Sequence, residues 1–437
     1  MKRIMIETYG CQMNKADSEL VAGVMYPKGY ASTENHDEAD VLLINTCAVR
    51  EGAEDRILGI LAQYRRFKEV KPNMVLGVIG CMAQNLKESL IEQRPWVDLV
   101  VGPDAYRDLP QLIDNLQSGD REPAVLVRRD RFENYEEIFP VRGEGTNAWV
   151  SIMRGCDNFC TFCIVPHTRG RERSRKLHSI IREVEEAVQH GFGEITLLGQ
   201  NVNSWIDEES GEHFADLMKA VGEIPGVKRV RFTSPHPKDF PDPLLYAMVE
   251  NPAVLVPHIH LPLQAGNDIV LERMNRGYTK KEYLALVDHI RSIIPDVAFS
   301  TDVIVGFPGE TAEQFEDTVE VMRAVRYSGA FMFKYSQRPY TKAANWLDDV
   351  PEAEKQRRLE RLITLQREQE KALINSYIGT KSVILIESIS PKSDQEWIGR
   401  TPQNRPCVLP VTAGKPGELV PVEIVAVRSL TLVGQPV

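Results

Sequence analysis

Residues 154–175 read RGCDNFCTFCIVPHTRGRERSR and contain three cysteines, Cys156, Cys160 and Cys163, in the spacing CxxxCxxC. They follow an apolar run, residues 148–155, whose composition is typical of a strand. Three thiolates in one short loop can hold a [4Fe-4S] cluster with one iron left open, and such an iron can chelate the amino and carboxylate groups of S-adenosylmethionine. Electron transfer through the cluster would then cleave the sulfonium bond of that cofactor.

The same loop allows two other interpretations. Zinc could be held by the three cysteines with His167 as the fourth ligand, although zinc motifs usually come as pairs of CxxC. The cysteines could also be structural, but a free cysteine normally behaves as a small buried hydrophobe, whereas these lie in a loop. An iron–sulfur centre therefore fits the spacing best, and both alternatives stay open.

The chain from residue 148 onward predicts a parallel α/β fold. Amphipathic helical stretches, such as 179–191 and 311–325, have apolar residues three and four apart and separate the apolar runs. Helical crossovers of this kind join parallel strands. Six βα units give a partial (β/α)6 barrel, short of the eight that close a barrel, with functional groups at the carboxyl ends of the strands. The six predicted strands are residues 148–155, 194–199, 230–234, 258–263, 298–306 and 329–336.

The two ends of the chain predict different folds. About the first 140 residues repeat the alternation on a smaller scale, with a helical segment at 52–67, and predict an open α/β domain. After a long helical segment at 351–379, short alternating runs divided by Gly and Pro predict a small β-barrel. The polar stretch 128–147 has no clear period and is expected to be linker or edge structure. The expected domains are 1–140, 141–375 and 376–437. The expected strands are 3–10, 39–47, 74–81 and 97–102 in the first domain and 382–390, 406–413, 419–429 and 430–437 in the last.

A second set of three cysteines lies in the amino-terminal domain. Cys11, Cys47 and Cys81 are far apart in sequence, but each follows a predicted strand. Parallel strands of one sheet end at the same edge, so the three loops are expected to meet there. A single such cysteine would be interpreted as buried core. All three at the same point of a strand–loop–helix unit instead indicate a second three-thiolate Fe-S cluster. Cys407, alone in the last domain, is expected to be structural.

Polar side chains follow the strands of the predicted barrel and suit the cofactor. We expect Gln200, Ser234, Gln264 and Asp302 to lie at one mouth of the barrel and to bind S-adenosylmethionine. The alternative for strand-end polar residues is that they cap the following helices. For Asp302 the alternative is a hydrogen-bonded structural acid. No side chain is assigned as an acid or base catalyst.

The composition narrows the class of protein. The 437 residues are 43% hydrophobic and 26% charged, and no apolar run approaches the ~18 residues of a membrane span. The amino-terminal apolar run is broken at Glu7, so we expect no export signal and a cytoplasmic location. Seven cysteines, an odd number, argue against a disulfide framework. A formal net charge of -10 means that any contact with nucleic acid must use local basic patches.

Two local features could contact RNA. Arginines alternate along the loop after the CxxxCxxC motif and could bind phosphate or the cofactor carboxylate, although they could equally pair with neighbouring acids. Aromatic residues near the barrel mouth could stack on a flipped base, although core packing is the default interpretation. The residues in question are Arg169, Arg171, Arg173 and Arg175 in the loop, Arg400, Arg405 and Lys415 in the terminal barrel, and the aromatic residues Trp205, Phe333 and Tyr335.

With these motifs in place, the chain resembles the methylthiotransferase family of radical S-adenosylmethionine enzymes over essentially its whole length. That family joins an amino-terminal three-cysteine domain, a radical barrel and a terminal TRAM module, and residues 399–410, GRTPQNRPCVLP, are similar to the TRAM pattern. Several stretches resemble the branch that acts on tRNA carrying an isopentenyl-type group on the adenosine next to the anticodon. These are YGCQMNKADSE at 9–19, CTFCIVPHTRGRERSR at 160–175, LLGQNVNSW at 197–205, HLPLQAGNDIVLERMNRGYT at 260–279 and YSQRPYTKAA at 335–344.

The resemblance implies two [4Fe-4S] clusters, with Cys156, Cys160 and Cys163 holding the radical-generating one and Cys11, Cys47 and Cys81 an auxiliary one for sulfur delivery. One S-adenosylmethionine would methylate a sulfur atom, and a second would yield the 5′-deoxyadenosyl radical that activates C2-H of the adenosine. The product would be a 2-methylthio derivative. The implied partners are the tRNA anticodon arm with its N6-isopentenyl-type adenosine, an electron-donor protein and a source of sulfur, with no membrane.

Other functions compete with this one. Within the same chemistry, the substrate could be threonylcarbamoyl-adenosine in tRNA or an aspartate of a ribosomal protein, and the segments GQNVNSW and RPYTKAA favour the isopentenyl branch over both. In a different class, the protein could be a non-catalytic Fe-S protein that binds RNA or carries electrons. A zinc-bound RNA module is the third alternative.

Overall fold

The computed structural model describes residues 1–48, 53–119 and 122–437, so the first residue of the predicted helical segment 52–67 lies outside the described residues. The chain forms two compact units. Unit 1 consists of Met1–Gly143, Met153–Asp157 and Cys163–Arg175, and unit 2 of Glu144–Ile152, Asn158–Phe162 and Lys176–Val437. Within the described residues, no helix has both the length and the apolar character of a membrane span.

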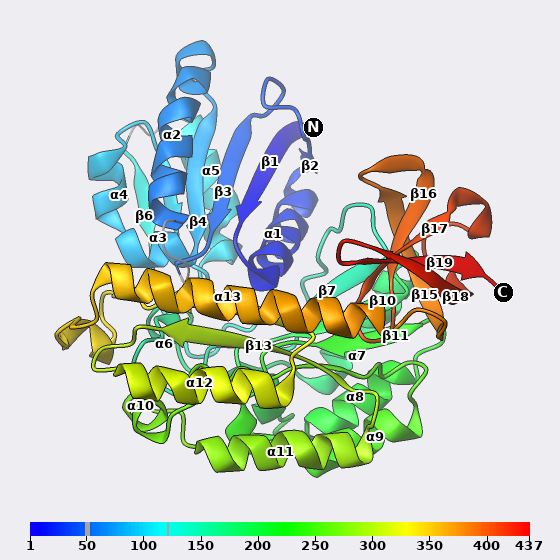
Figure 1. The fold of residues 1–437 in the computed structure, drawn as a ribbon. Helices are drawn as coiled ribbons and strands as arrows, with labels where there is room; N and C mark the ends of the chain where they lie inside the picture. Colours follow the sequence, from blue (N-terminus) through cyan, green and yellow to red (C-terminus); the bar gives the residue numbers. More distant parts are fainter. Residues whose placement is uncertain (49–52, 120–121) are drawn as a thin grey trace. The chain divides into compact units, whose positions relative to one another are not determined.

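Unit 1 is an open, parallel α/β sheet with the strand order β2-β1-β3-β4-β5-β6 (Figure 1). The strands are β1 (Lys2–Tyr9), β2 (Tyr30–Ser32), β3 (Val41–Thr46), β4 (Val75–Gly80), β5 (Leu99–Val101) and β6 (Ala124–Leu126). The four predicted strands are present, and the two short edge strands β2 and β6 were not predicted. Every residue of β3 and β4 is buried, as expected for central strands of a parallel sheet that is covered on both faces.

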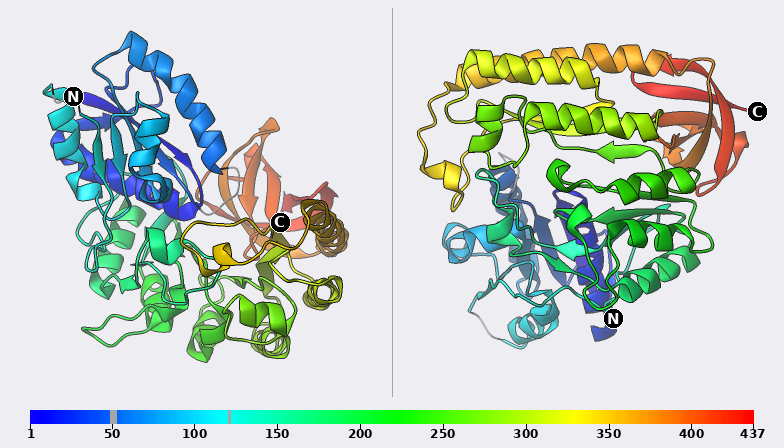
Figure 2. Two further views of the ribbon diagram at one scale, coloured as in Figure 1. Left: turned by 90° about the vertical axis from the view of Figure 1, so that its left-hand side faces the viewer. Right: turned by 90° about the horizontal axis from the view of Figure 1, so that it is seen from below.

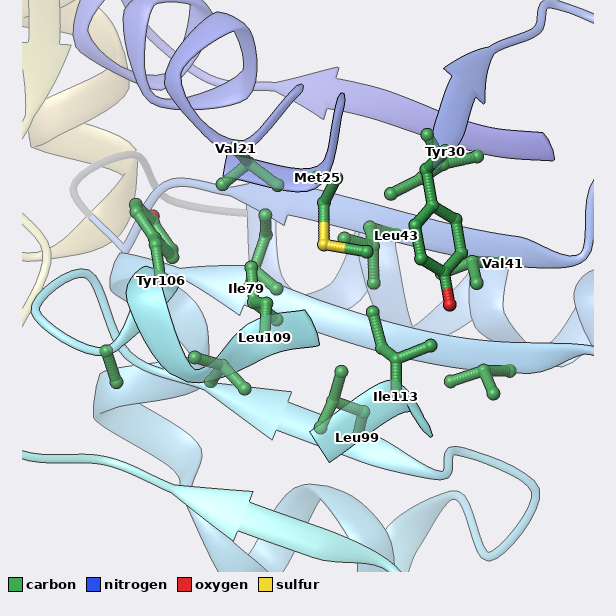
Figure 3. Close-up of a cluster of buried hydrophobic side chains, with 14 of the residues drawn as sticks. Val21, Met25, Tyr30, Val41, Leu43, Ile79, Leu99, Tyr106, Leu109 and Ile113 are labelled. Atoms are coloured by element: carbon green, nitrogen blue, oxygen red, sulfur yellow. The ribbon is translucent and has the colours of Figure 1, made fainter. Parts of the chain in front are cut away.

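Helices cover the two faces of this sheet. On one face, Val21 and Met25 of α1 (Gln12–Met25) pack with Ile113 of α5 (Leu109–Gln117) over the side chains of the central strands (Figure 3). On the other face, α2 (Ala53–Val70), α3 (Cys81–Leu86) and α4 (Glu88–Gln93) pack over Leu42 and Val78. Each fully buried aliphatic side chain contributes about 1.5–3 kcal/mol of transfer free energy. The remaining elements of unit 1 are η1 (Tyr26–Lys28), η2 (Tyr106–Asp108), β8 (Met153–Arg154), α6 (Val165–Thr168) and β9 (Arg173–Ser174).

Unit 2 begins as the predicted partial barrel. Its parallel strands form the sheets β11-β10-β7 and β12-β13-β14, and a bridge between Val230 and Leu255 continues the pairing beyond β11. The strands are β7 (Asn147–Ser151), β10 (Glu194–Leu198), β11 (Arg229–Phe232), β12 (His258–His260), β13 (Ala298–Val305) and β14 (Gly329–Lys334). All six predicted strands are therefore present, and the partial (β/α)6 architecture is confirmed.

Helices lie outside these strands, as the green-to-orange segments of Figures 1 and 2 show. For example, α7 packs against β7, α8 against β11 and α13 against β14. The helices are α7 (Leu177–Gln189), α8 (Phe214–Gly222), α9 (Asp242–Glu250), α10 (Asp268–Arg273), α11 (Lys280–Ile293), α12 (Ala312–Val325) and α13 (Glu352–Asn375), with the short turns η3 (Val202–Ser204), η4 (Pro237–Asp239) and η5 (Lys342–Asn345).

The last segment of unit 2 is a closed five-stranded barrel in the order β15-β16-β17-β19-β18. The expected small β-barrel is confirmed, but strand β16 (Ser393–Arg400) was not predicted because its sequence, SDQEWIGR, is mostly polar. The buried Arg229 of β11 joins this barrel to the parallel strands: its guanidinium donates to the carbonyl oxygens of Arg400 at 2.7 Å and Val383 at 2.6 Å. The other elements are β15 (Lys381–Ser390), β17 (Pro406–Pro410), η6 (Val411–Ala413), β18 (Leu419–Arg428) and β19 (Thr431–Pro436).

The polar stretch 128–147 contains neither helix nor strand up to residue 146, and its last residue, Asn147, begins β7. One of its residues is nevertheless core. Tyr135 is 3% exposed, its hydroxyl donates to the carbonyl oxygen of Pro103 at 2.9 Å, and it accepts from the backbone N–H of Tyr106. A buried phenol normally finds such partners. The stretch is therefore attached to unit 1 rather than loose.

A buried histidine makes unit 2 sensitive to acid. His236 Nδ1 accepts from the backbone N–H of Lys238 at 3.2 Å, and burial, together with Arg276 and Lys238, lowers the pKa of His236 to about 3. The unfolded chain takes up this proton near pH 6.5 and the folded chain does not, so stability falls as pH drops from about 6.5 towards 3. We predict that His236→Asn removes about 1.4 kcal/mol per pH unit from this slope.

Urea unfolding at several pH values checks this. The matched control for the substitution itself is His190→Asn, at an exposed histidine that directly follows α7. Equal slopes for the wild type and His236→Asn between about pH 6.5 and pH 5 would contradict the assignment.

Candidate functional site

The first set of site residues lies at one edge of the sheet of unit 1. Cys11 precedes α1 and follows β1, Cys47 follows β3, and Cys81 follows β4. The strand register pairs Tyr9 with Thr46 and Thr46 with Gly80. Cys47 and Cys81 therefore directly follow paired residues, and Cys11 follows its strand by one further residue. The structure places the three loops together, as the topology predicts.

The thiols interact with one another. Cys47 donates a hydrogen bond to Cys11, and this lowers the pKa of Cys11 to about 6 against the effect of burial, with help from the positive charge of Arg169. Burial raises the pKa of Cys81, while Arg169 acts in the opposite direction and the charge of Cys11 adds to the effect of burial. Cys47 and Cys81 are buried and Cys11 is partly exposed. The three side chains thus share one environment.

Two buried asparagines hold the loops in place. Asn14 Nδ2 donates to Asn45 Oδ1 at 2.9 Å and to the carbonyl oxygen of Thr46 at 3.1 Å, and Asn45 Nδ2 donates back to the carbonyl oxygen of Asn14 at 2.8 Å. Asn14 Oδ1 accepts from the backbone N–H of Cys11 at 3.3 Å. At Gly80, φ is +93°, and a Cβ would lie 2.5 Å from Asn45 Oδ1. Only glycine fits there.

The CxxxCxxC loop is divided between the two units. Its ends belong to unit 1, where β8 pairs antiparallel with β9 and the N–H of Cys156 donates to the carbonyl oxygen of Gly170 at 3.2 Å. In this unit Cys81 packs with Ala48 and with Ile164, the residue after Cys163. The segments that carry Cys47 and Cys81 therefore contact the segment that carries Cys163.

The middle of the motif belongs to unit 2. Here Cys160 Sγ accepts a hydrogen bond from Arg276 Nη1 at 3.2 Å, and Thr161 donates through its backbone and side chain to the carbonyl oxygens of Met274 and Arg273. Sequence reasoning missed Arg276. The stretch ERMNRGYT, quoted only for its resemblance, was the signal that could have directed attention to it.

The donor chemistry around Cys11, Cys47 and Cys81 fits an anionic cluster. Arg169 Nη1 and Thr46 Oγ1 are buried there and have no hydrogen-bond partner among the described residues. Soft thiolate ligands suit an Fe-S cluster, and three thiolates outweigh the charge of an oxidised cubane core, so the loaded site is anionic. Across residues 1–48, 53–119 and 122–437, no group of three or more His, Cys, Asp or Glu side chains already has metal-site geometry. The assignment of ligands therefore stays a proposal.

The zinc alternative depends on His167. This residue lies on α6, and burial and Arg129 lower its pKa. Its ring is half-buried, and among the described residues it forms no ready metal group with Cys, Asp, Glu or other His side chains. None of the seven cysteines forms a disulfide.

The four residues expected to bind S-adenosylmethionine lie on the carboxyl side of neighbouring parallel strands. Gln200 follows β10 and Ser234 follows β11, each by two residues. Gln264 follows β12, and its backbone N–H donates to the carbonyl oxygen of Asp302 at 2.8 Å. Asp302 lies in β13, where its Oδ2 is 3.3 Å from Nε2 of His260. Gln264 and Asp302 are thus neighbours, and Ser234 and Gln264 both have positive φ, at 63° and 67°.

Most of the arginines considered for RNA are buried instead. Arg169 and Arg173 pair with Asp17 and Asp104 inside unit 1, and only Arg171 is exposed, paired with Asp157. The arginines do pair with acids, but the expected solvated loop is found only at Arg171, because Arg169 and Arg173 are buried and their partners are distant in sequence. The basic residues of the terminal barrel are also paired: Arg400 with Glu387, Arg405 with Glu370 and Lys415 with Glu418.

The aromatic candidates divide in the same way. Trp205 and Tyr335 are buried, in agreement with core packing. Phe333 on β14 is 37% exposed, and Phe331, which sequence reasoning missed, is 55% exposed on the same face of that strand. Phe331 also packs edge-on against His260. Exposed aromatic residues therefore lie beside the strand that carries Asp302.

Known proteins match this chain along its length. Residues 3–102 match the family described as Uncharacterized protein family UPF0004, residues 150–322 the Radical SAM superfamily and residues 375–437 the TRAM domain. Two curated relatives carry the name tRNA-2-methylthio-N(6)-dimethylallyladenosine synthase. The protein of Chloroherpeton thalassium is 45% identical over 433 residues, covering 99% of this chain and 95% of its own, and that of Porphyromonas gingivalis is 47% identical over 442 residues, covering 99% and 95%.

Solved structures share the fold. The radical S-adenosylmethionine methyltransferase TsrM from Kitasatospora setae has a TM-score of 0.58 and 13% identity and covers 79% of this chain and 75% of its own. The cobalamin-dependent S-adenosylmethionine radical enzyme OxsB has a TM-score of 0.52 and 12% identity over 85% of this chain and 56% of its own.

These matches agree with the cysteine motif and the partial barrel. The chain is a radical S-adenosylmethionine enzyme with an amino-terminal α/β domain and a terminal TRAM barrel. More narrowly, it belongs to the family of the tRNA-2-methylthio-N(6)-dimethylallyladenosine synthases.

Asn14 offers a test of the scaffold under the cysteine loops. Replacing Asn14 by Ala removes the donor to Asn45 Oδ1 and the acceptor of the backbone N–H of Cys11, and each buried group left unsatisfied costs about 1–3 kcal/mol. The Nδ2 of Asn45 keeps its bond to the backbone carbonyl oxygen of residue 14. We predict that Asn14→Ala lowers the free energy of unfolding by about 2–3 kcal/mol. Urea unfolding measures this, with Asn115→Ala on the exposed side of α5 as control. An Asn14→Ala protein as stable as the control would contradict the scaffold role.

Proposed function

We propose that this protein converts N6-isopentenyl-type adenosine next to the anticodon of tRNA into its 2-methylthio derivative. One S-adenosylmethionine donates the methyl group, and a second supplies the 5′-deoxyadenosyl radical. The observation that carries the proposal is the full-length similarity, near 45% identity, to synthases named for this product. The cysteine chemistry supports it, because the C2-H bond of a purine offers no acidic proton to an ordinary base.

We assign the ligands of two [4Fe-4S] clusters within this proposal. Cys156, Cys160 and Cys163 would hold the radical-generating cluster, and Cys11, Cys47 and Cys81 the auxiliary one. When bound, such clusters supply one-electron reduction at the first site and sulfur delivery at the second. The hydrogen bond from Cys47 to Cys11 and the nearby charge of Arg169 support the second assignment.

The S-adenosylmethionine contacts are also part of the proposal. Gln200, Ser234 and Gln264 follow parallel strands, at the carboxyl side where ligands bind in barrels of this kind. Asp302 would act together with His260, which orients its carboxylate. The exposed rings of Phe331 and Phe333 would provide a stacking surface for the adenine, since aromatic side chains commonly hold unstacked bases.

The remaining parts of the proposal concern organisation and partners. We divide the chain into an amino-terminal methylthiotransferase domain at 1–140, a radical core at 141–375 and a TRAM domain at 376–437. The tRNA anticodon arm is the substrate. The balance of the reaction requires electrons and sulfur, which we assign to an electron-donor protein and a source of sulfur. We place the reaction in the cytoplasm, because the proposed substrate is tRNA.

Mass analysis of nucleosides tests the reaction. Reconstituted protein, S-adenosylmethionine and a reductant are incubated with tRNA carrying isopentenyl-adenosine, and we expect a mass gain that matches replacement of H by SCH3. Parallel reactions use tRNA with threonylcarbamoyl-adenosine and a ribosomal-protein aspartate substrate, and we expect no gain in either. A gain on one of those substrates alone would overturn the choice of substrate. Absence of reductant-dependent 5′-deoxyadenosine would favour a passive Fe-S carrier.

Iron and sulfide content tests the ligand assignment. We predict that a variant with Ala at Cys156, Cys160 and Cys163 keeps about half of the wild-type iron, because the second set still holds one cluster. The converse variant, with Ala at Cys11, Cys47 and Cys81, should also keep about half. Cys407→Ala, in the terminal barrel, is the control and should keep all of it. Zinc without iron and sulfide would support the zinc alternative.

A further inference from the structure

Unit 1 contains a buried cluster of three charged side chains beside the amino-terminal cysteines. Asp17 on α1 accepts from both terminal nitrogens of Arg154, at 3.0 and 2.7 Å, and from Arg169 Nη2 at 2.7 Å. The side chains of all three residues are at most 4% exposed. One carboxylate therefore binds two guanidinium groups away from water.

The charges of this cluster do not balance. The two arginines carry one more positive charge than Asp17 neutralises. The next carboxylate, Asp104, is already held by both terminal nitrogens of Arg173. Tyr106 and Tyr135 are neutral, because burial raises the pKa of both phenols. A buried, uncompensated charge costs several kcal/mol, so the cluster favours an additional anion nearby.

Arg169 faces the place where that anion would lie. It directly follows α6, and α6 packs against α3, the helix that begins at Cys81. Its Nη1 is buried and has no hydrogen-bond partner among the described residues. A loaded three-thiolate site is anionic and would supply the missing charge at this position.

The position of the arginines in the sequence links the two cysteine sets. Arg154 precedes Cys156 by two residues, and Arg169 follows Cys163 by six. Both are bound by one carboxylate on α1, the helix that begins directly after Cys11. Asp17 therefore fixes both ends of the CxxxCxxC loop to α1, the helix that follows Cys11.

We infer that Arg169 is a positioning residue that provides the counter-charge of the auxiliary cluster, and that Asp17 orients it and couples the auxiliary site to the radical-cluster loop. This inference rests on the proposed ligand role of Cys11, Cys47 and Cys81. The guanidinium stabilises the anionic site, and it should also raise the reduction potential of the cluster, because a nearby positive charge favours the more negative, reduced state.

The test uses the full chain with Ala at Cys156, Cys160 and Cys163, so that only the auxiliary cluster contributes. In this background, Arg169→Met should release iron to a chelator about 10–100-fold faster, the range typical of lost outer-sphere partners. Its EPR-monitored reduction potential should shift to a lower value. Arg169→Lys keeps the charge and should retain a potential closer to that of the parent. The matched control is Arg171→Met, an exposed arginine of the same loop, which should change neither quantity.

Asp17→Asn tests the coupling. It also provides a second variant in case Arg169→Met does not fold. If Asp17 acts by orienting Arg169, the effects of Asp17→Asn and Arg169→Met on iron release should be far from additive in the double variant. Additive effects would overturn the role of Asp17. Iron release and potential of Arg169→Met equal to those of Arg171→Met would overturn the role of Arg169. If Arg169→Met does not fold, Arg169→Lys decides: because Lys keeps the positive charge, a reduction potential far below that of the parent would contradict the charge role.

Failure of this inference can be distinguished from failure of the proposed function. If the parent with only the amino-terminal cysteines binds no iron, the ligand assignment fails and the inference fails with it. If the parent binds iron and the Arg169 variants match the control, only the inference fails. Methylthiolation by the otherwise wild-type chain is measured independently and is unaffected by either result.

Discussion

Parallel pairing of β1, β3 and β4 is the constraint on which the site depends. Neighbouring parallel strands end at one edge, and the register pairs Tyr9 with Thr46 and Thr46 with Gly80, so the residues that follow them must be close. A one-residue slip of any strand would turn its side chains to the opposite face and displace the cysteine loop behind it. The buried hydrogen bonds between Asn14 and Asn45 act against such a slip.

Much of this arrangement could be predicted from the sequence because it follows from topology. The six strands of the partial barrel and the four predicted strands of unit 1 are runs of alternating or continuous apolar residues, which the sequence shows directly. The convergence of Cys11, Cys47 and Cys81 needed only the rule that parallel strands share a carboxyl edge. Strand β16 escaped because Ser393–Arg400 alternates few apolar residues, and its place depends on closure of the barrel rather than on its own composition.

The partners of the arginines could not be predicted from the sequence. Arginine at every second position, 169, 171 and 173, would put all three on one side of an extended segment, but the sequence cannot say which of them meets water and which meets protein. In the structure Arg171 is exposed, whereas Arg169 and Arg173 are buried. Their partners, Asp17 and Asp104, lie 152 and 69 residues away. Arg276 was missed for the same reason, since its contact with Cys160 spans 116 residues. Long-range ion pairs have no local pattern, so only the folded chain reveals them.

The unbalanced charges of the buried cluster around Asp17 have a chemical consequence. With a second carboxylate the cluster around Asp17 would be neutral and would give an anion no advantage, and without Asp17 the two guanidiniums of Arg154 and Arg169 would repel each other. One carboxylate for two arginines holds both in place and leaves a single positive charge beside the thiols. A ligand that binds only the folded chain stabilises it by mass action. An anionic cluster at this position would therefore offset the free-energy cost of desolvating the arginines. If Cys11, Cys47 and Cys81 hold the proposed cluster, folding of unit 1 and loading of its cysteines would therefore be energetically coupled.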